Sequence, residues 1–191
     1  MSLRLSGGRK LLSPPGQQTR PTSSRLRLAV LNLLAAELGG CRWLDLCCGS
    51  GVMGCEALQR GAQQVVAVDH DQATLAIARR NLEAVKASVN PACDLRVIRA
   101  SLPLWLGQGP AQQLGENAAA GFDLIYADPP YASALYVPIA ERVAATGWLA
   151  VGGRLLWECS SGSYPEVPSG WELVDQRRYG SCGLMILAPA A

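Results

Sequence analysis

A glycine-rich turn between an apolar strand and a helix constrains the fold of this chain more than any other stretch. Residues 42–48 form an apolar, strand-like run, Gly49-Ser50-Gly51 follows at once, and residues 52–60 are typical of a helix that ends at Gly61. Glycine permits a tight turn and a close approach of the backbone to a neighbouring group. The stretch therefore predicts a strand–turn–helix unit of the kind that builds open parallel sheets.

The same alternation of strands and helices continues along the chain. Further strands are expected at 64–69, 95–100, 124–127, 154–159, 171–179 and 184–187, and further helices at about 23–38, 70–86 and 135–146. This alternation predicts an α/β, Rossmann-like fold with a mostly parallel seven-stranded sheet and helices on both faces. The last two strands leave no room for a crossover helix, so an antiparallel edge strand is expected. Residues 102–121 are expected to form a loop or a weak helix.

The composition fits one folded domain, with 191 residues, 49% hydrophobic and 17% charged. The seven cysteines include no Cys-x-x-Cys pair and there is one histidine, so neither a disulfide framework nor a metal site is expected. No stretch approaches the roughly 20 apolar residues that span a bilayer, and the first residues lack the apolar core of a signal peptide. A reducing cytoplasm is the expected setting.

Basic residues dominate the beginning of the chain. The first 36 residues contain no acid, whereas the remainder has eleven basic and fifteen acidic residues. The basic residues of this arm are Arg4, Arg9, Lys10, Arg20, Arg25 and Arg27. A basic arm on a mildly acidic body suits contact with a phosphate backbone, so residues 1–38 are expected to contact nucleic acid and residues 39–191 to form the main domain. The alternative is an arginine-rich composition without a binding role.

The glycine-rich turn has the spacing of a cofactor site. Gly49-x-Gly51-x-x-Gly54 follows a strand and opens a helix. Asp69 lies twenty residues beyond Gly49, where an acid can bind a ribose diol. This spacing suits both NAD(P) and S-adenosylmethionine, and a turn that binds nothing is a third alternative. Asp45, inside the strand, favours S-adenosylmethionine, because a carboxylate suits an ammonium and a sulfonium better than a pyrophosphate.

Four other residues are candidates for this cofactor site. Cys47 and Ser50 belong to the glycine-rich turn itself. His70 follows Asp69 and would either lie against an adenine edge or face solvent at the start of a helix. Ser101 follows the third strand, where an acceptor for the adenine amine would be useful, although a serine serves that purpose weakly.

A second motif stands directly after the strand expected at 124–127. It reads Asp128-Pro129-Pro130-Tyr131, and the two prolines must end the strand because they lack N–H donors. The stiff turn fixes the directions of the Asp128 carboxylate, the Pro129 carbonyl and the Tyr131 ring. Two acceptors and a flat aromatic plate suit a planar ring that bears an exocyclic amine. An ordinary proline turn is the alternative.

Together these motifs resemble those of class I S-adenosylmethionine-dependent methyltransferases. Two further stretches, Arg20-Pro21-Thr22-x-x-Arg25-x-Arg27 and Glu56-Ala57-Leu58-x-Arg60-Gly61-Ala62, resemble the bacterial RsmD family of 16S rRNA guanine-N2 methyltransferases. The resemblance covers essentially the whole chain. It implies S-adenosylmethionine as cofactor, no metal, and methylation of a guanine in 16S rRNA on an assembling small ribosomal subunit.

The resemblance also assigns roles to residues. Asp128 and the Pro129 carbonyl would orient the amine, and Tyr131 would stack on a base that has left its helix. From the charge of the first 36 residues, the residues expected to contact RNA are Arg9, Lys10, Arg20, Arg25 and Arg27. Ser101 departs from the family, which usually places an acid at that position.

Four kinds of activity stay open from the residues alone. The amine could belong to guanine in rRNA, or to adenine N6 in DNA or a glutamine side chain of a protein. A large target-recognition insertion would favour DNA, and none is visible. An NAD(P)-dependent oxidoreductase would need a catalytic pair such as Tyr-x-x-x-Lys, which is missing. An RNA-binding module without catalysis would not need the intact Asp-Pro-Pro-Tyr motif.

Overall fold

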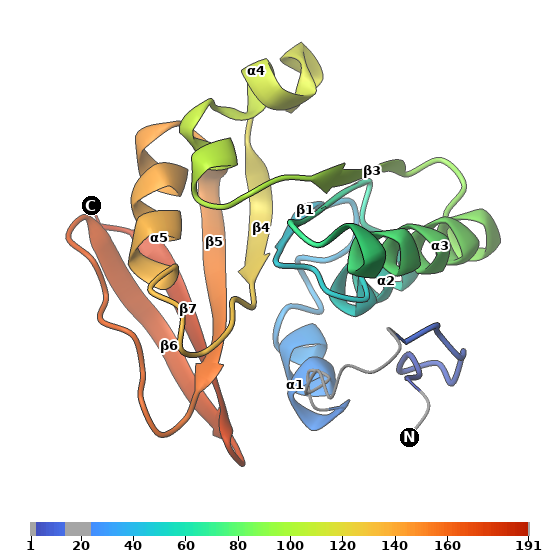
Figure 1. Cartoon of the computed structure of the whole chain (residues 1–191), viewed down its shortest axis with the longest axis horizontal. Helices are drawn as coiled ribbons and strands as arrows, with labels where there is room; N and C mark the ends of the chain where they lie inside the picture. The colour runs from blue at the N-terminus through green and yellow to red at the C-terminus, as the bar shows by residue number, and fades with distance from the viewer. Residues whose placement is uncertain (1–2, 14–23, 191) are drawn as a thin grey trace. The chain divides into compact units, whose positions relative to one another are not determined.

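The computed structural model describes residues 3–13 and 24–190 (Figure 1). The chain forms two compact units, Met1–Arg99 and Ala100–Ala191. The boundary predicted after residue 38 stays a prediction, and the described residues before it belong to the first unit.

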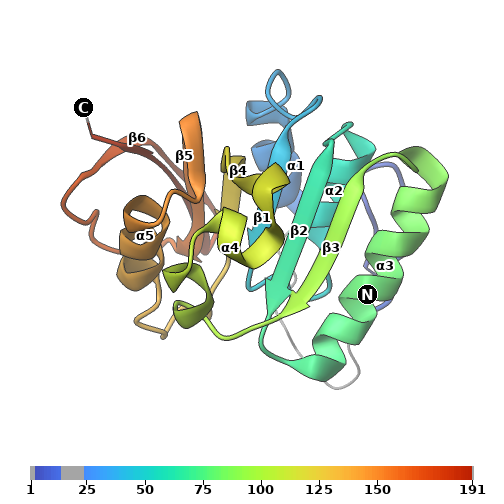
Figure 2. The ribbon, with the colours of Figure 1, turned by 90° about the horizontal axis from the view of Figure 1, so that it is seen from above.

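The first unit is a three-stranded parallel sheet with helices. Its elements are α1 Ser24–Leu33, β1 Arg42–Leu46, α2 Val52–Gln59, β2 Gln64–Asp69, α3 Gln72–Val89 and β3 Asp94–Arg99. The strand order is β3-β2-β1, and every residue of the central strand β2 is buried. Figure 2 shows α2 and α3 against these strands, and the two helices also contact each other. Helix α2 connects β1 to β2 and α3 connects β2 to β3, and such helical connections are what parallel neighbours require.

The N-terminal arm of the first unit is a small hairpin that turns at Gly7-Gly8. Arg4 and Lys10 form an antiparallel bridge, and the Gly8 amide donates to the Leu5 carbonyl at 2.9 Å. Gly8 has a φ of 84°, which favours glycine.

Several predicted boundaries in the first unit were wrong. Helix α1 ends at Leu33 and not near Leu38, because the chain continues in turns in which the Leu38 amide donates to Leu34. The predicted start of this helix lies outside the described residues. Strand β1 ends at Leu46, since Cys47 has a φ of 57° and leaves the extended conformation. Helix α3 begins at Gln72, after the His70 that was expected to open it.

The second unit combines parallel and antiparallel strands. Its elements are the 3₁₀ helices η1 Leu104–Gly107 and η2 Glu116–Ala118, α4 Pro110–Leu114, β4 Phe122–Ala127, α5 Tyr136–Ala145, β5 Leu149–Ser160, β6 Trp171–Tyr179 and β7 Cys182–Pro189. The order is β4-β5-β7-β6, with β4 and β5 parallel and β7 antiparallel to both its neighbours. The predicted α/β class with seven strands, mostly parallel and with an antiparallel edge, is confirmed.

Strand β5 begins earlier than predicted, at Leu149 and not at Arg154. Its pairing with β4 shifts register between Phe122 and Leu124, which lets the chain continue through the Gly152-Gly153 pair. A Cβ on Gly153 would lie 2.8 Å from the Phe122 carbonyl oxygen, so only glycine allows this close approach. The sequence alone showed the glycines and suggested that the strand starts after them.

Candidate functional site

The glycine-rich turn after β1 is tied to the end of β2 in the first unit. The Cys48 amide donates to the Val68 carbonyl at 3.0 Å, and the Gly49 amide donates to Asp69 Oδ2 at 2.9 Å. Asp69 is buried. The structure therefore brings together the two parts of the predicted cofactor fingerprint, the first glycine and the acid twenty residues beyond it.

Asp69 also organises the start of α3. Its Oδ1 accepts a hydrogen bond from the Asp71 amide at 3.0 Å and lies 3.4 Å from Nδ1 of His70. Asp71 is the N-cap of α3, since its side chain accepts from the Thr74 amide at 2.7 Å. The His70 side chain is 77% exposed, so His70 faces solvent beside Asp69 while Asp71 caps the helix.

Asp45 lies beneath the turn and is buried. Its Oδ2 accepts a hydrogen bond from the Gly54 amide in the first turn of α2 at 3.0 Å. Burial raises the pKa of Asp45 to about 7; the Gly54 hydrogen bond lowers it and the charge of Asp69 raises it further. Two interacting carboxylates next to the turn favour a cationic ligand and disfavour a pyrophosphate.

The three glycines of the fingerprint have different surroundings. A Cβ on Gly49 would meet no atom within 4 Å, so the turn has open space at this residue. A Cβ on Gly51 would lie 3.1 Å from Leu82 Cδ1, and one on Gly54 would lie 3.0 Å from Leu82 Cδ2. Gly51 and Gly54 therefore let α2 pack closely on α3, while Gly49 leaves room for a ligand. This open turn with carboxylates beside it fits S-adenosylmethionine, whose sulfonium and ammonium are cationic.

A residue that the sequence reading missed holds this turn from the side of α3. Buried Asn81 donates through Nδ2 to the Ser50 carbonyl and to the Leu12 carbonyl, both at 3.0 Å. Its Oδ1 accepts from the Leu12 amide at 2.9 Å. Asn81 thus links the N-terminal arm to the predicted cofactor turn. In the sequence, the feature that could have identified Asn81 is an amide side chain next to Leu82, on the buried face of the helix.

The structure places Arg27 differently from the RNA contact predicted for it. Its guanidinium Nε lies 3.0 Å from Oε1 of Glu56, and both side chains are buried. Glu56 also accepts hydrogen bonds from the amide and the hydroxyl of Ser6, at 2.7 and 2.6 Å. Arg27 and Glu56 therefore fasten the arm and α1 to α2, and a buried, ion-paired Arg27 has no surface to offer a phosphate.

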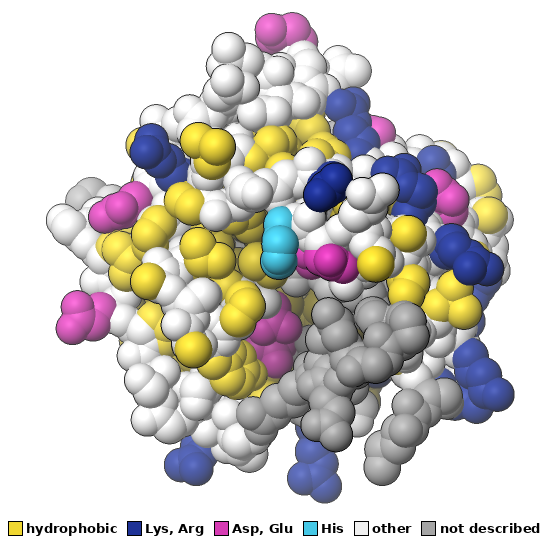
Figure 3. Space-filling model, in the orientation of Figure 1, with side chains coloured by type: hydrophobic (Ala, Val, Ile, Leu, Met, Phe, Trp, Pro, Cys, Tyr) yellow, Lys and Arg dark blue, Asp and Glu magenta, His cyan; other side chains and the backbone are white. Residues whose placement is uncertain are grey.

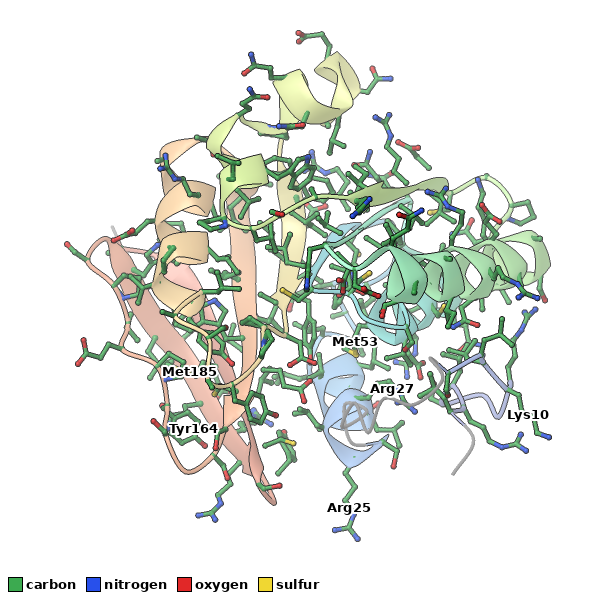
Figure 4. All side chains as sticks on the ribbon, in the orientation of Figure 1. Lys10, Arg25, Arg27, Met53, Tyr164 and Met185 are labelled. Carbon is green, nitrogen blue, oxygen red and sulfur yellow. The ribbon has the colours of Figure 1, made fainter. Side chains whose placement is uncertain are left out.

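The other arginines and the lysine predicted to bind RNA differ in exposure. Arg9 is half-buried and donates to the Ala84 carbonyl at 2.8 Å. Lys10 and Arg25 are exposed, and Figure 4 shows their side chains extending away from the ribbon. Arg20 lies outside the described residues. Lys10 and Arg25 are the described candidates whose exposure suits a phosphate contact.

The Asp128–Tyr131 motif lies directly after β4 in the second unit, as predicted. The Tyr131 hydroxyl donates to Oε1 of Glu158 at 3.4 Å, and the Tyr126 hydroxyl donates to Oε2 at 2.6 Å. The Tyr136 hydroxyl donates to the Glu158 carbonyl at 2.9 Å and lies 3.4 Å from the Pro129 carbonyl. Buried Glu158 on β5 therefore positions Tyr131 by a hydrogen bond, a role that was not predicted from the sequence.

Tyr131 and Cys159 are held in their neutral forms. Burial raises the pKa of Tyr131, and a hydrogen bond with Cys182 and the charge of Glu158 act in the same direction. Burial also raises the pKa of Cys159 to about 12, with Glu158 adding to the effect. A neutral phenol and a neutral thiol are not bases at neutral pH, so Tyr131 is suited to stacking and hydrogen bonding.

A cavity of about 350 Å³ opens beside Tyr131 within the second unit. Its lining includes Tyr131, Ser133, Tyr136, Cys159, Ser163 and Glu166. Figure 3 shows hydrophobic side chains gathered over α5 and the neighbouring loop on this face of the unit. The cavity combines aromatic walls with a few polar groups, as small-molecule sites do.

Ser101 is exposed near the start of the second unit, where its carbonyl accepts from the Trp105 amide at 3.0 Å. Its predicted contact with an adenine amine stays a prediction. Within residues 3–13 and 24–190, no cluster of three or more His, Cys, Asp or Glu side chains could hold a metal ion. In the same part of the chain, no helix has the length and apolarity needed to cross a membrane.

Comparison with known proteins identifies the family. The family model described as "Conserved hypothetical protein 95" matches residues 5–188. The chain is 29% identical over 167 residues to ribosomal RNA small subunit methyltransferase D of Escherichia coli strain K12, which covers 87% of this chain and 77% of the relative. The enzyme with the same name from Haemophilus influenzae is 27% identical over 173 residues, covering 91% of this chain and 84% of the relative.

A solved structure agrees with this assignment. The putative methyltransferase yhhF from Escherichia coli aligns with a TM-score of 0.79 and 27% identity, over 100% of this chain and 99% of that chain. The chain therefore belongs to the RsmD family and is a class I methyltransferase that uses S-adenosylmethionine.

Proposed function

We propose that the chain transfers a methyl group from S-adenosylmethionine to the exocyclic N2 amine of a guanine in 16S rRNA. The proposed setting is the cytoplasm, on an assembling small ribosomal subunit. The observation that carries the proposal is the Asp128–Tyr131 motif after β4, supported by buried Glu158, in a chain whose relatives are named small subunit methyltransferases.

The first unit supplies the groups that would hold the cofactor. Asp69 is the acceptor for a ribose hydroxyl, next to the open turn at Gly49. Buried Asp45 lies beside this turn, and its pKa of about 7 leaves its carboxyl group partly ionised near neutral pH. S-adenosylmethionine, when bound, supplies the methyl group and a sulfonium leaving group. Cys47, Ser50, His70 and Ser101 are the remaining proposed contacts.

The second unit supplies the groups that would act on the amine. The lone pair of an exocyclic guanine amine is delocalised into the ring, which makes the nitrogen a poor nucleophile. The Asp128 carboxylate and the Pro129 carbonyl would accept hydrogen bonds from the amine and so orient its lone pair. The Asp128 charge would also stabilise positive charge that develops on the nitrogen, an effect confined to the transition state. Tyr131 would stack on the flipped-out base.

Methylation of DNA adenine or of a protein glutamine amide is the alternative with the same chemistry. The relatives' names favour RNA of the small subunit over both. The exposed Lys10 and Arg25 also suit a phosphate-bearing substrate.

Methyl transfer to purified components tests the proposal. Small-subunit particles from cells that lack the enzyme should accept labelled methyl groups from S-adenosylmethionine, and nucleoside analysis should identify N2-methylguanine. Asp128→Ala should slow the transfer by about 100-fold while cofactor affinity stays nearly unchanged. The exposed Glu172 on β6 gives a control, since Glu172→Ala also removes one carboxylate of the unit. Label found only in DNA or protein would overturn the assignment.

A further inference from the structure

The cavity beside Tyr131 is built from four segments of the second unit. Tyr131 and Ser133 follow β4, Tyr136 opens α5, and Cys159 lies near the end of β5. Ser163 and Glu166 come from the loop between β5 and β6. Its volume of about 350 Å³ falls within the range of sites that hold small ligands.

The loop that carries Glu166 is seated on the neighbouring strands. The Tyr164 ring lies against the backbone of β7, where a Cβ on Gly183 would be 2.5 Å from its Cε1 (Figure 4). The Tyr164 hydroxyl donates to the Arg177 carbonyl at 3.4 Å. At the start of the loop, the Ser161 hydroxyl donates to the Gly180 carbonyl at 2.8 Å. The loop therefore presents its side chains to the cavity from a fixed position.

Among the described residues that line this cavity, Glu166 is the one with a charged side chain. It is exposed, and it makes no hydrogen bond or ion pair within the described part of the chain. The Ser133 hydroxyl is buried and also has no hydrogen-bond partner among the described residues. The cavity thus presents a strong acceptor, the Glu166 carboxylate, to which a ligand with an N–H or O–H group could donate.

Guanine and adenine differ in the groups that such a cavity would meet. The Watson–Crick edge of guanine carries an N1–H donor beside its N2 amine, whereas N1 of adenine is an acceptor. Enzymes that act on a flipped base read this edge through hydrogen bonds. A carboxylate accepts from N1–H of guanine and meets a lone pair on N1 of adenine, which it disfavours.

We propose that Glu166 is a specificity residue that accepts a hydrogen bond from N1–H of the target guanine in the cavity beside Tyr131. This inference rests on the proposed function and adds the selection of the base to it. Asp128 and Pro129 act on the N2 amine, and Glu166 acts on the adjacent ring position. A base that has the amine and lacks N1–H is therefore a poor substrate.

The base 2-aminopurine provides the test, because it keeps the exocyclic amine and lacks N1–H. Small-subunit particles are reconstituted with rRNA that carries either guanine or 2-aminopurine at the position that the wild-type enzyme methylates. The wild type should methylate the 2-aminopurine particle about 10- to 100-fold more slowly, the range expected for a hydrogen bond to a charged group. Glu166→Ala should slow guanine methylation by a similar factor and leave the 2-aminopurine rate unchanged.

This double comparison isolates the contact between the residue and the base. Glu172→Ala, with the same charge change on β6, should keep the wild-type ratio of the two rates. Thermal unfolding of all three proteins shows whether each variant is folded. An unchanged ratio in Glu166→Ala would refute the specificity role while methylation of guanine upholds the proposed function. Absence of guanine methylation by the wild type would refute both.

Discussion

The Arg27 guanidinium and the Glu56 carboxylate form an ion pair of 3.0 Å that is closed off from solvent. Glu56 stands in α2, directly after the cofactor turn, and Arg27 stands in α1. The Ser6 hydroxyl donates to the same carboxylate at 2.6 Å. The basic arm is therefore partly a structural element that is fixed to the cofactor-binding unit.

Removing one member of this pair should destabilise the protein. Arg27→Ala leaves the Glu56 charge buried without its cationic partner, and such a change costs about 3–5 kcal/mol. Urea denaturation should show this loss in the free energy of unfolding. Arg25→Ala, in the same helix and exposed, should change stability by less than about 0.5 kcal/mol. Equal stability of the two variants would contradict the structural role of Arg27.

The exposed basic residues of the arm should govern RNA binding. Lys10→Ala plus Arg25→Ala should weaken binding to small-subunit particles and flatten its salt dependence by roughly two units of log–log slope. Affinity for S-adenosylmethionine should stay the same. Arg80→Ala is a control, since Arg80 is an exposed arginine of α3 in the same unit. A double variant with wild-type binding across a salt series would place the RNA contact elsewhere.

The different roles of Arg25 and Arg27 follow from helix geometry, and the signal was present in the sequence. Arg27 is three and four residues before Val30 and Leu31, which are buried, so it shares their face of α1. Arg25 is two residues away from Arg27 and points to another side. The prediction from the charge of the arm did not distinguish Arg25 from Arg27.

The fold and both motifs were predictable because glycine and proline act locally. Gly49 and Gly51 set the turn after β1, and Pro129 ends β4, whatever the rest of the chain does. The partners of buried acids were not predictable in this way. Glu56 pairs with Arg27, 29 residues away, and Glu158 accepts from Tyr131 and Tyr126, 27 and 32 residues away. Only tertiary packing reveals contacts between residues so far apart in the sequence.

The hydrogen bond between Asp69 and Gly49 predicts the effect of changing the acid. Asp69→Ala removes both the acceptor for the Gly49 amide and the proposed acceptor for the ribose, so affinity for S-adenosylmethionine should fall by about 10- to 100-fold. Calorimetry measures this, with Glu83→Ala on the exposed side of α3 as control. NAD(H) should bind neither protein. Tighter binding of NAD(H) than of S-adenosylmethionine would contradict the cofactor site.

Burial of Asp45 should make stability depend on pH. Its pKa of about 7 in the folded protein is above the ordinary value of 3.8, so the folded state holds a proton that the unfolded state has released. The contribution of this proton to the free energy of unfolding is complete below pH 3.8. It is lost as the pH rises to about 7, at up to about 1.4 kcal/mol per pH unit. The Asp45→Asn variant has no titratable group at this position.

Denaturation of wild type and Asp45→Asn at a series of pH values measures this contribution as a difference. The variant should gain stability relative to the wild type as the pH rises through this window, and the difference should level off above about pH 7. The subtraction removes groups that titrate alike in both proteins. A difference independent of pH would mean that Asp45 has the same pKa in the folded and unfolded states.

The support of Tyr131 by Glu158 gives a prediction about catalysis. Glu158→Gln keeps the size of the side chain and replaces the carboxylate that accepts hydrogen bonds from the Tyr131 and Tyr126 hydroxyls by a neutral amide. If Glu158 acts by positioning the Tyr131 ring, turnover should fall by about 10-fold, because small errors in orientation are costly, while cofactor affinity is retained.

Tyr131→Phe separates positioning from general stability. It keeps the ring and removes only the hydroxyl that reaches Glu158, so its turnover should fall by a similar factor. The double variant Tyr131→Phe plus Glu158→Gln should be no slower than Glu158→Gln alone, since Tyr131→Phe removes a contact that Glu158→Gln has already weakened. Tyr179→Phe on β6 is the control for loss of a phenol. Multiplying losses in the double variant, with equal thermal stability, would show that Glu158 acts independently of Tyr131.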